Sequence, residues 1–207
     1  MKTWTIPRCF EGGAVAVLAS GPSMSQRGAD QVHLAGIPAI AVNSTYRLAP
    51  WAWMLYAADT EWWQHPTNRD AHQFQGLRAS CQAVKGVHML RNAGTEGFNT
   101  DPDCVHTLGN SGAQAMQIAV KAGAARVLLL GMDMGGCHWH GAHPPGLRDT
   151  VPDTYAKWVQ RITMAAPAML ATGVDIVNCT PGSALKCFRA STLEAEIAKM
   201  GVLWEGL

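Results

Sequence analysis

The chain has 207 residues, of which 48% are hydrophobic and 15% charged, and its formal net charge is +1. A chain of this length forms one sizeable core, and a near-neutral balance without charge runs gives no signal for nucleic-acid binding. No apolar run is long enough to span a membrane, and residues 1–13 lack the apolar segment of a signal peptide. The six cysteines show no C-x-x-C pair, so the sequence predicts reduced thiols in a cytoplasmic protein.

The first predicted element is a strand followed by a glycine turn. The run Ala14–Ala19 is compact and apolar, and Gly21, Pro22 and Ser23 follow it. Gly21 permits a sharp turn or a close approach of the backbone to a ligand, and Pro22 favours the start of a helical turn. The spacing matches neither the G-x-G-x-x-G dinucleotide motif nor a P-loop, which disfavours an ordinary NAD-binding or P-loop NTPase fold.

Predicted strands and helices alternate along the rest of the chain. The further strands are Ala39–Asn43, Arg126–Leu130 and Val174–Asn178, with weaker signals at Trp53–Ala57 and Val87–Leu90. The predicted helices are Ala113–Ala122, Asp153–Thr172 and Ser191–Met200, with a kink expected at Pro167. This alternation predicts an α/β fold with a Rossmann-like, mostly parallel, doubly wound sheet in a single domain over residues 1–207. Residues 64–107 are expected to be irregular, and residues 135–152 to form a mobile loop over a site.

The stretch Leu108–Gly136 predicts a turn, a helix, a buried strand and a second turn. Ser111 begins an S-x-x-Q capping box and is therefore the expected N-cap of the helix. The strand Arg126–Leu130 leads directly to Gly131 and Asp133. Free N–H groups at a helix start bind phosphate oxygens, and residues just past a strand lie at the edge where open α/β sheets bind ligands. The sequence therefore predicts a site for an anionic ligand here.

Four motifs together resemble a known family. They occur in the expected order and comprise Leu18–Ser23, Ala41–Asn43, Asn110–Gly112 with Val127–Asp133, and Thr180–Leu185. In these motifs the chain resembles the nucleotide-binding fold of bacterial lipooligosaccharide sialyltransferases and the related family that contains archaeal-type 6-hydroxymethylpterin diphosphokinase. Small members of this family occur in phage genomes, so the resemblance is compatible with a phage origin.

The resemblance implies a site for the CMP part of a sugar donor or for a nucleoside triphosphate. Matched position by position, the residues implied to bind it are Gly21, Pro22, Ser23, Asn43, Asn110, Ser111, Gly112, Gly131 and Asp133. The first three would face the phosphate and ribose. Asn43 would hydrogen-bond the nucleotide, and the helix start around Ser111 would receive the base or ribose.

The chain departs from the sialyltransferases where their general base stands. Those enzymes carry a histidine just before the long late helix, whereas residues 149–154 hold none and Tyr155 is the nearest tyrosine. Histidines occur earlier, at His138, His140 and His143. One of them is expected to serve as general base or phosphate donor, and His143, which precedes two prolines, is expected to be the best held.

Two patterns leave alternatives open. Cys137 with the three following histidines is a possible zinc-binding set, although the pattern is more typical of a flexible polar loop with exposed histidines. The segment Trp51–Trp63 is rich in tryptophan around Asp59. On the diphosphokinase side of the resemblance, Asp59 with Asp133 would bind Mg²⁺ beside phosphates. Alternatively, the tryptophans pack in the core and the acid caps the next helix.

Group transfer from a nucleotide or nucleotide-sugar, of the CMP-sugar glycosyltransferase type, is the predicted function. The alternative enzyme is a Mg²⁺-dependent diphosphokinase, and the candidate catalytic residues are His143, His140, His138 and Asp59. Rivals from other classes are a catalytically silent nucleotide-binding protein and an interaction module that docks a partner through exposed tryptophans. The expected partner is a small-molecule nucleotide or nucleotide-sugar. The sequence does not indicate which nucleobase is bound, which substrate accepts the transferred group, or the oligomeric state.

Overall fold

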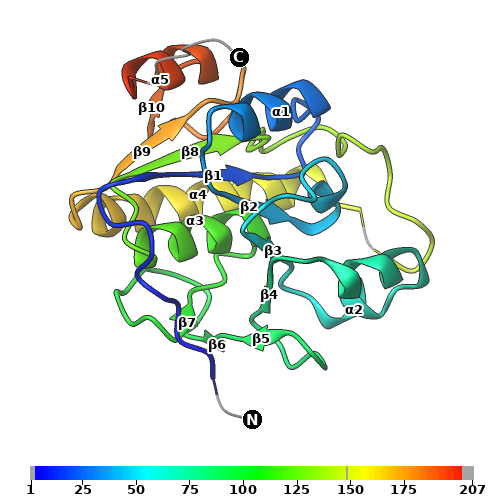
Figure 1. Cartoon of the computed structure of the whole chain (residues 1–207). Coiled ribbons are helices and arrows are strands. Elements are labelled where there is room, and N and C mark those ends of the chain that lie inside the picture. Colours follow the sequence, from blue (N-terminus) through cyan, green and yellow to red (C-terminus); the bar gives the residue numbers. More distant parts are fainter. Residues whose placement is uncertain (1–2, 148, 202–207) are drawn as a thin grey trace.

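The computed structural model describes residues 3–147 and 149–201 and contains one large parallel sheet (Figure 1). The sheet has eight strands in the order β10-β9-β8-β1-β2-β3-β4-β5, and its strand pairs are parallel. The strands are β1 (Ala14–Leu18), β2 (Ala39–Val42), β3 (Met54–Tyr56), β4 (Leu77–Ser80), β5 (His88–Met89), β8 (Arg126–Leu130), β9 (Asp175–Asn178) and β10 (Arg189–Ala190). A short parallel pair, β6 (Arg91–Asn92) with β7 (Cys104–Val105), lies beside it. The predicted Rossmann-like α/β fold is confirmed.

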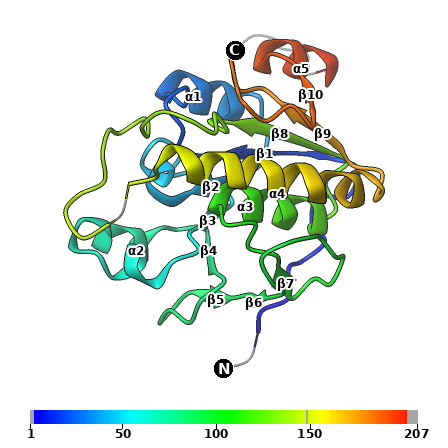
Figure 2. The same cartoon turned by 180° about the vertical axis from the view of Figure 1, so that it is seen from behind.

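Helices cover both faces of the sheet (Figure 2). They are α1 (Gln26–Leu34), α2 (Thr60–Gln64), α3 (Ser111–Lys121), α4 (Pro152–Leu170) and α5 (Leu193–Lys199), with 3₁₀ helices at Asn43–Arg47 and Pro66–Gln73. The helix α4 continues through Pro167 to Leu170. None of the helices in the described part of the chain has the length and apolar character needed to cross a membrane.

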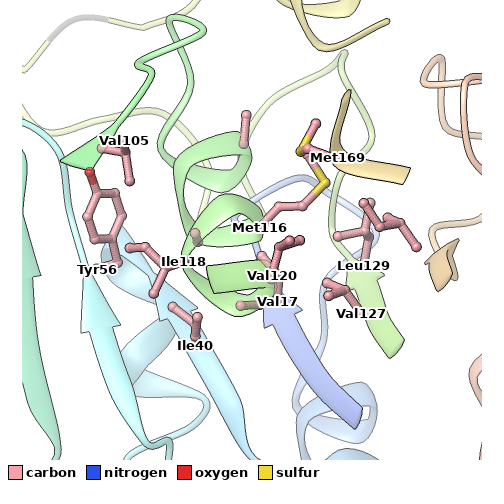
Figure 3. Close-up of a cluster of buried hydrophobic side chains, with 14 of the residues drawn as sticks. Val17, Ile40, Tyr56, Val105, Met116, Ile118, Val120, Val127, Leu129 and Met169 are labelled. Carbon is pink, nitrogen blue, oxygen red and sulfur yellow. The ribbon is translucent and has the colours of Figure 1, made fainter. Parts of the chain in front are cut away.

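Alternation along each strand divides the core into two layers. In β1, Val15 and Val17 face the layer that packs against α3 and α4, whereas Ala16 and Leu18 face the layer that contains α1. Figure 3 shows the first layer, in which Met116 of α3 and Met169 of α4 meet the strand side chains. Strands covered on both faces carry continuous apolar runs, and β8 shows this pattern, with Val127–Leu130 buried.

The structure corrects the interpretation of two regions. The helix α1 was not among the predicted helices, because it buries only Ala29 and Val32 and is otherwise polar. It begins at Gln26 behind the N-cap Ser25, so Pro22 does not open it. Residues 64–107 are not wholly irregular, since they contain β4 through β7 and a 3₁₀ helix. Their strands are short and interrupted by charged residues such as Arg78, which hides the apolar signal.

Candidate functional site

A pocket of about 540 Å³ opens at the carboxyl-terminal edge of the sheet. Its wall is formed by the segments that follow β1, β2, β3 and β8 and by the starts of α3 and α4. In the sheet, β2 lies on one side of β1, and β8 lies on the other side. This reversal of strand order is the topological switch point at which open α/β sheets bind ligands.

Most of the residues predicted for the site line this pocket. They are Gly21, Asn43, Asp59, Asn110, Ser111, Gly112, Gly131, Asp133, His138 and His143. The lining does not include Pro22, Ser23 or His140. Sequence reasoning missed the contribution of α4, which supplies Thr154, Tyr155 and Trp158. The available signal was that Trp158 follows Tyr155 by three residues and Thr154 by four at the start of a helix, which places it on the same helix face as each of them.

Two glycines let the loops after β1 and β8 touch. The N–H of Gly21 donates to the carbonyl of Gly131 at 2.9 Å. A Cβ on Gly21 would collide with Asp133 Oδ2 and lie 2.5 Å from the Gly131 carbonyl oxygen. Gly131 itself has φ +69°, a conformation that L side chains rarely adopt. The pocket floor therefore depends on glycine at both positions.

Asp133 ties these loops together through Ser23. The backbone N–H of Ser23 donates to Asp133 Oδ1 at 3.3 Å, and its hydroxyl donates to Oδ2 at 2.9 Å. Burial raises the pKa of the Asp133 carboxyl, while the Ser23 hydrogen bonds act in the opposite direction. Ser23 thus contributes by positioning Asp133, from outside the pocket lining.

The helix α3 directs its N-terminus at the pocket. Asn110, not Ser111, is its N-cap, and Asn110 Oδ1 accepts from the Ala113 N–H at 3.0 Å. The N-cap carbonyl accepts from Gln114 N–H at 3.2 Å. Among the described residues, the Ser111 and Gly112 N–H groups have no protein acceptor assigned, and these are the groups that a helix start offers to anions.

The start of α4 faces the same pocket. Its N-cap, Val151, makes no side-chain capping bond, and Thr150 and Val151 line the pocket beside Thr154. The Tyr155 hydroxyl donates to the Gly136 carbonyl at 2.8 Å, which ties α4 to the segment after β8. Two helix dipoles therefore present their positive ends to one cavity.

Unusual backbone conformations surround the pocket. Asn43, Leu108 and Met134 are the non-glycine residues with positive φ in the described ranges, at 50°, 47° and 58°. Asn43 and Met134 line the pocket, and Leu108 precedes the pocket residue Gly109. Such conformations cost about 1–3 kcal/mol each and cluster at functional sites.

Asp59 lines the pocket from the N-cap position of α2. Asp59 thus occupies the N-cap position that the structural alternative required, but its carboxylate makes no capping hydrogen bond. Burial in the pocket wall raises the pKa of Asp59, and the charge of Glu61 raises it further. Asp133 and Asp149 are the other acids of the lining, whose described residues include no lysine or arginine.

The tryptophans around Asp59 belong to the core. Trp62 and Trp63 are buried, and Trp63 Nε1 donates to the Ala57 carbonyl at 3.0 Å. Trp51 and Trp53 pack against buried clusters. The large hydrophobic side chains exposed on the described surface are Leu34, Val151, Met164 and Leu170. An apolar docking patch on Trp51–Trp63 is therefore not present.

The three histidines after β8 pack against one another. The ring centroids of His138 and His143 lie 4.4 Å apart, those of His138 and His140 5.1 Å, and those of His140 and His143 5.6 Å. Burial, with the neighbouring imidazoles, lowers the pKa of His140 to about 4 and also lowers that of His143. Within residues 3–147 and 149–201, no three His, Cys, Asp or Glu side chains are grouped so that they could hold a metal ion. The zinc interpretation of Cys137 and these histidines therefore gains no support.

The contacts do not single out His143 as the best-held ring. His138 Nδ1 lies 3.2 Å from the Ser20 carbonyl, whereas His143 is held through its backbone N–H, which donates to Asp149 Oδ1 at 2.8 Å. The next residue, Trp139, donates from its backbone to the Ser20 carbonyl and from Nε1 to Thr45 Oγ1, both at 3.1 Å. Residues 138–139 are thereby hydrogen-bonded to the segments that follow β1 and β2.

The far part of this segment reaches α2. In both views it passes beside α2 before α4 begins (Figures 1 and 2), and His65 Nε2 lies 3.1 Å from the Pro145 carbonyl. Of the described residues between β8 and α4, residues 131–135, 138, 143 and 149–151 line the pocket.

The chain is a Rossmann-like α/β protein with a pocket at the switch point of its sheet. Comparison with protein-family models and with curated proteins finds no match to it.

Proposed function

We propose that this chain binds a nucleotide or nucleotide-sugar in the switch-point pocket and transfers a group from it, as a glycosyltransferase with a CMP-sugar type of donor site. The observation that carries the proposal is the convergence of the α3 and α4 N-termini on one cavity at the switch point. Helix N-termini stabilise phosphate charge, and a phosphate leaving group develops that charge during transfer.

The lining supports a complete nucleotide as the ligand. Asn43 and Asn110 place amide groups on the pocket wall, and amides recognise the edge of a base or a ribose hydroxyl. Since Asn110 Oδ1 caps α3, its NH₂ group is the part left to donate to a ligand. Trp158 offers an aromatic surface on the α4 side. A cavity of about 540 Å³ is in the size range of small-molecule sites.

A Mg²⁺-dependent diphosphokinase is the second candidate, and Asp59 favours it. The Asp59 carboxylate makes no capping bond and lies in a lining with no lysine or arginine among its described residues. Mg²⁺ is typically bound by one or two carboxylates together with substrate phosphate oxygens, and Asp59 with Asp133 would provide them. A catalytically silent nucleotide-binding protein uses the same pocket without turnover.

A turnover assay separates these functions. The chain is incubated with a CMP-activated sugar, and separately with ATP or CTP, each with Mg²⁺ or with EDTA, and phosphorus NMR follows the nucleotide products. The glycosyltransferase predicts CMP release that EDTA does not reduce and that Asp59→Asn changes by less than about tenfold, since one general catalyst accounts for about 10²–10⁴-fold.

The second candidate predicts the opposite pattern. Triphosphate cleavage would then require Mg²⁺ and would be abolished in Asp59→Asn. Glu11→Gln is the matched control, because Glu11 pairs with Arg8 on the surface outside the pocket. Binding of a nucleotide without any product over hours would contradict both enzymes and support the silent binding protein.

A further inference from the structure

The main chain fixes the tautomer of His138. Its Nδ1 lies 3.2 Å from the Ser20 carbonyl oxygen, and a carbonyl only accepts. Nδ1 therefore carries the proton in this contact, and Nε2 of the neutral ring is left with a free lone pair. A ring nitrogen in this state is the form that accepts a proton from a substrate.

Ser20 is itself anchored through its side chain. Ser20 Oγ donates to the Val42 carbonyl at 3.0 Å and lies 3.0 Å from Thr45 Oγ1. The backbone N–H of Trp139 donates to the same Ser20 carbonyl as the imidazole. His138 is thus oriented by β1 and β2 at the wall of the pocket, where both His138 and Ser20 are lining residues.

The neighbouring imidazoles are less suited to accept a proton. His140 lies outside the lining, and its Nε2 is buried without a hydrogen-bond partner. Burial and the nearby charges of His138, His143 and Arg47 favour its neutral form. His143 lines the pocket, and its backbone N–H donates to the Asp149 carboxylate. Burial and the charge of His138 favour the neutral form of the His143 ring as well. The other titratable groups close to His138 in the pocket or the chain are Asp59 and Asp133, which line the pocket, and Cys137, which precedes His138 in the sequence.

We propose that His138 Nε2 is the proton acceptor of the group transfer, and this inference rests on the proposed function. In the step, the hydroxyl of the acceptor gives its proton to His138 Nε2 as its oxygen bonds to the donor's sugar carbon. The bond between that carbon and the phosphate oxygen breaks, and its electron pair leaves with the nucleotide phosphate. The Ser20 carbonyl stabilises the imidazolium through Nδ1–H. The acceptor is therefore a hydroxyl-bearing molecule or water.

Two substitutions separate proton transfer from loop anchoring. His138→Asn places an amide NH₂ near the position of Nδ1, so the bond to the Ser20 carbonyl is retained while the proton acceptor is lost. Its melting temperature and CMP affinity are expected to stay within error of the parent chain, while CMP release falls by about 10²–10⁴-fold. The acid limb of the pH–kcat profile is expected to disappear. His33→Asn is the matched control, because His33 lies on α1 stacked against Trp51, outside the pocket.

Nitrogen NMR of the full chain with labelled histidine reads the tautomer directly. We expect the His138 signal, assigned by its loss in His138→Asn, to show a protonated Nδ1 and an unprotonated Nε2, and we expect CMP to shift the Nε2 resonance. A proton on Nε2, or an unmoved His138 signal in a sample that CMP saturates, overturns the inference. So does full turnover in His138→Asn with the loss instead in His143→Asn. If the parent chain binds no nucleotide at all, the proposed function is wrong, and the assignment of His138 as its proton acceptor is then wrong as well.

Discussion

The pocket is built on residues that have no side chain at the points of closest approach. Gly21 and Gly131 bring the β1 and β8 loops within hydrogen-bonding distance, and Asp133 then bonds Ser23 across the same junction. A larger side chain at Gly21 would have to displace both Asp133 and the Gly131 carbonyl. The predicted importance of these glycines therefore has a steric reason in the structure.

Gly21→Ala tests this steric argument. Overpacking of this kind costs about 1–3 kcal/mol, so we expect the free energy of unfolding in urea to fall by that amount. Because the displaced group is Asp133, nucleotide binding is expected to weaken as well. Gly135→Ala is the control for stability, since a Cβ there meets no atom within 4 Å and Gly135 also lines the pocket. Equal stability of the two variants would contradict the argument.

The pH dependence of stability reports on His140. The pKa of His140 is about 4 in the fold, against about 6.5 for an unperturbed histidine. Between these pH values the unfolded chain therefore binds a proton at His140 that the folded chain does not bind. Stability is therefore expected to fall as pH falls from 6.5 toward 4. The fall in melting temperature between pH 6.5 and pH 5 should be shallower in His140→Gln. An unchanged slope in that variant would show that His140 titrates normally in the fold.

Part of the pocket lining was predicted: Gly21 and Asp133 from the residues themselves, and Asn43 and Asp59 from the family resemblance. Parallel strands place their carboxyl ends at one edge, so Gly21, Asn43, Asp59 and Asp133 had to meet there once the sheet was correct. The sequence could not show that Trp158 joins them, because its apolar spacing also fits the buried face of a helix. Nor could it distinguish the three histidines, since their difference is a tertiary contact between His138 and Ser20.

At the scale of elements, the start of α3 is the structural basis of the anion site. Asn110 is the N-cap, although the S-x-x-Q spacing had predicted Ser111. Both residues are competent caps by type, and the one with extended backbone geometry takes the role. Ser111 is consequently the first residue of the helix itself, and it lines the pocket.

Substitution of each residue distinguishes the two caps. Asn110→Ala should lower the free energy of unfolding by about 1 kcal/mol, whereas Ser111→Ala should change it by less than about 0.5 kcal/mol. Urea denaturation of the two variants with the parent chain measures this. The reverse order of destabilisation would restore Ser111 as the cap.

The elements that bury most of their side chains were the ones that the sequence predicted well. The strand Arg126–Leu130 was predicted with its observed bounds, and β1, β2 and β9 to within a residue or so, because continuous apolar runs mark strands buried on both faces. The helices α3 and α4 were predicted from apolar spacing. In contrast, α1 and β4 bury few side chains and carry polar residues, so only the tertiary packing of the finished sheet reveals them.

At the scale of the whole molecule, the order of the strands creates the pocket. The chain builds β1 through β5 in one direction and then returns to add β8, β9 and β10 on the other side. The crevice at this reversal collects two helix N-termini, two glycine loops and the histidine segment after β8. Nucleotide binding at the switch point is therefore the property on which the proposed function depends.

The most direct measurement is the melting temperature of the full chain with CMP, CTP, CDP, ATP, GTP and UDP-sugars, each with and without Mg²⁺. A ligand at 100 times its dissociation constant adds about 2.7 kcal/mol, which raises the melting temperature of a chain of this size by about 5–10 °C. We expect such a shift with cytidine nucleotides, independent of Mg²⁺ and smaller in Gly21→Ala. A shift only with Mg²⁺ and a triphosphate would favour the diphosphokinase, and no shift with any nucleotide would show that this pocket does not bind nucleotides.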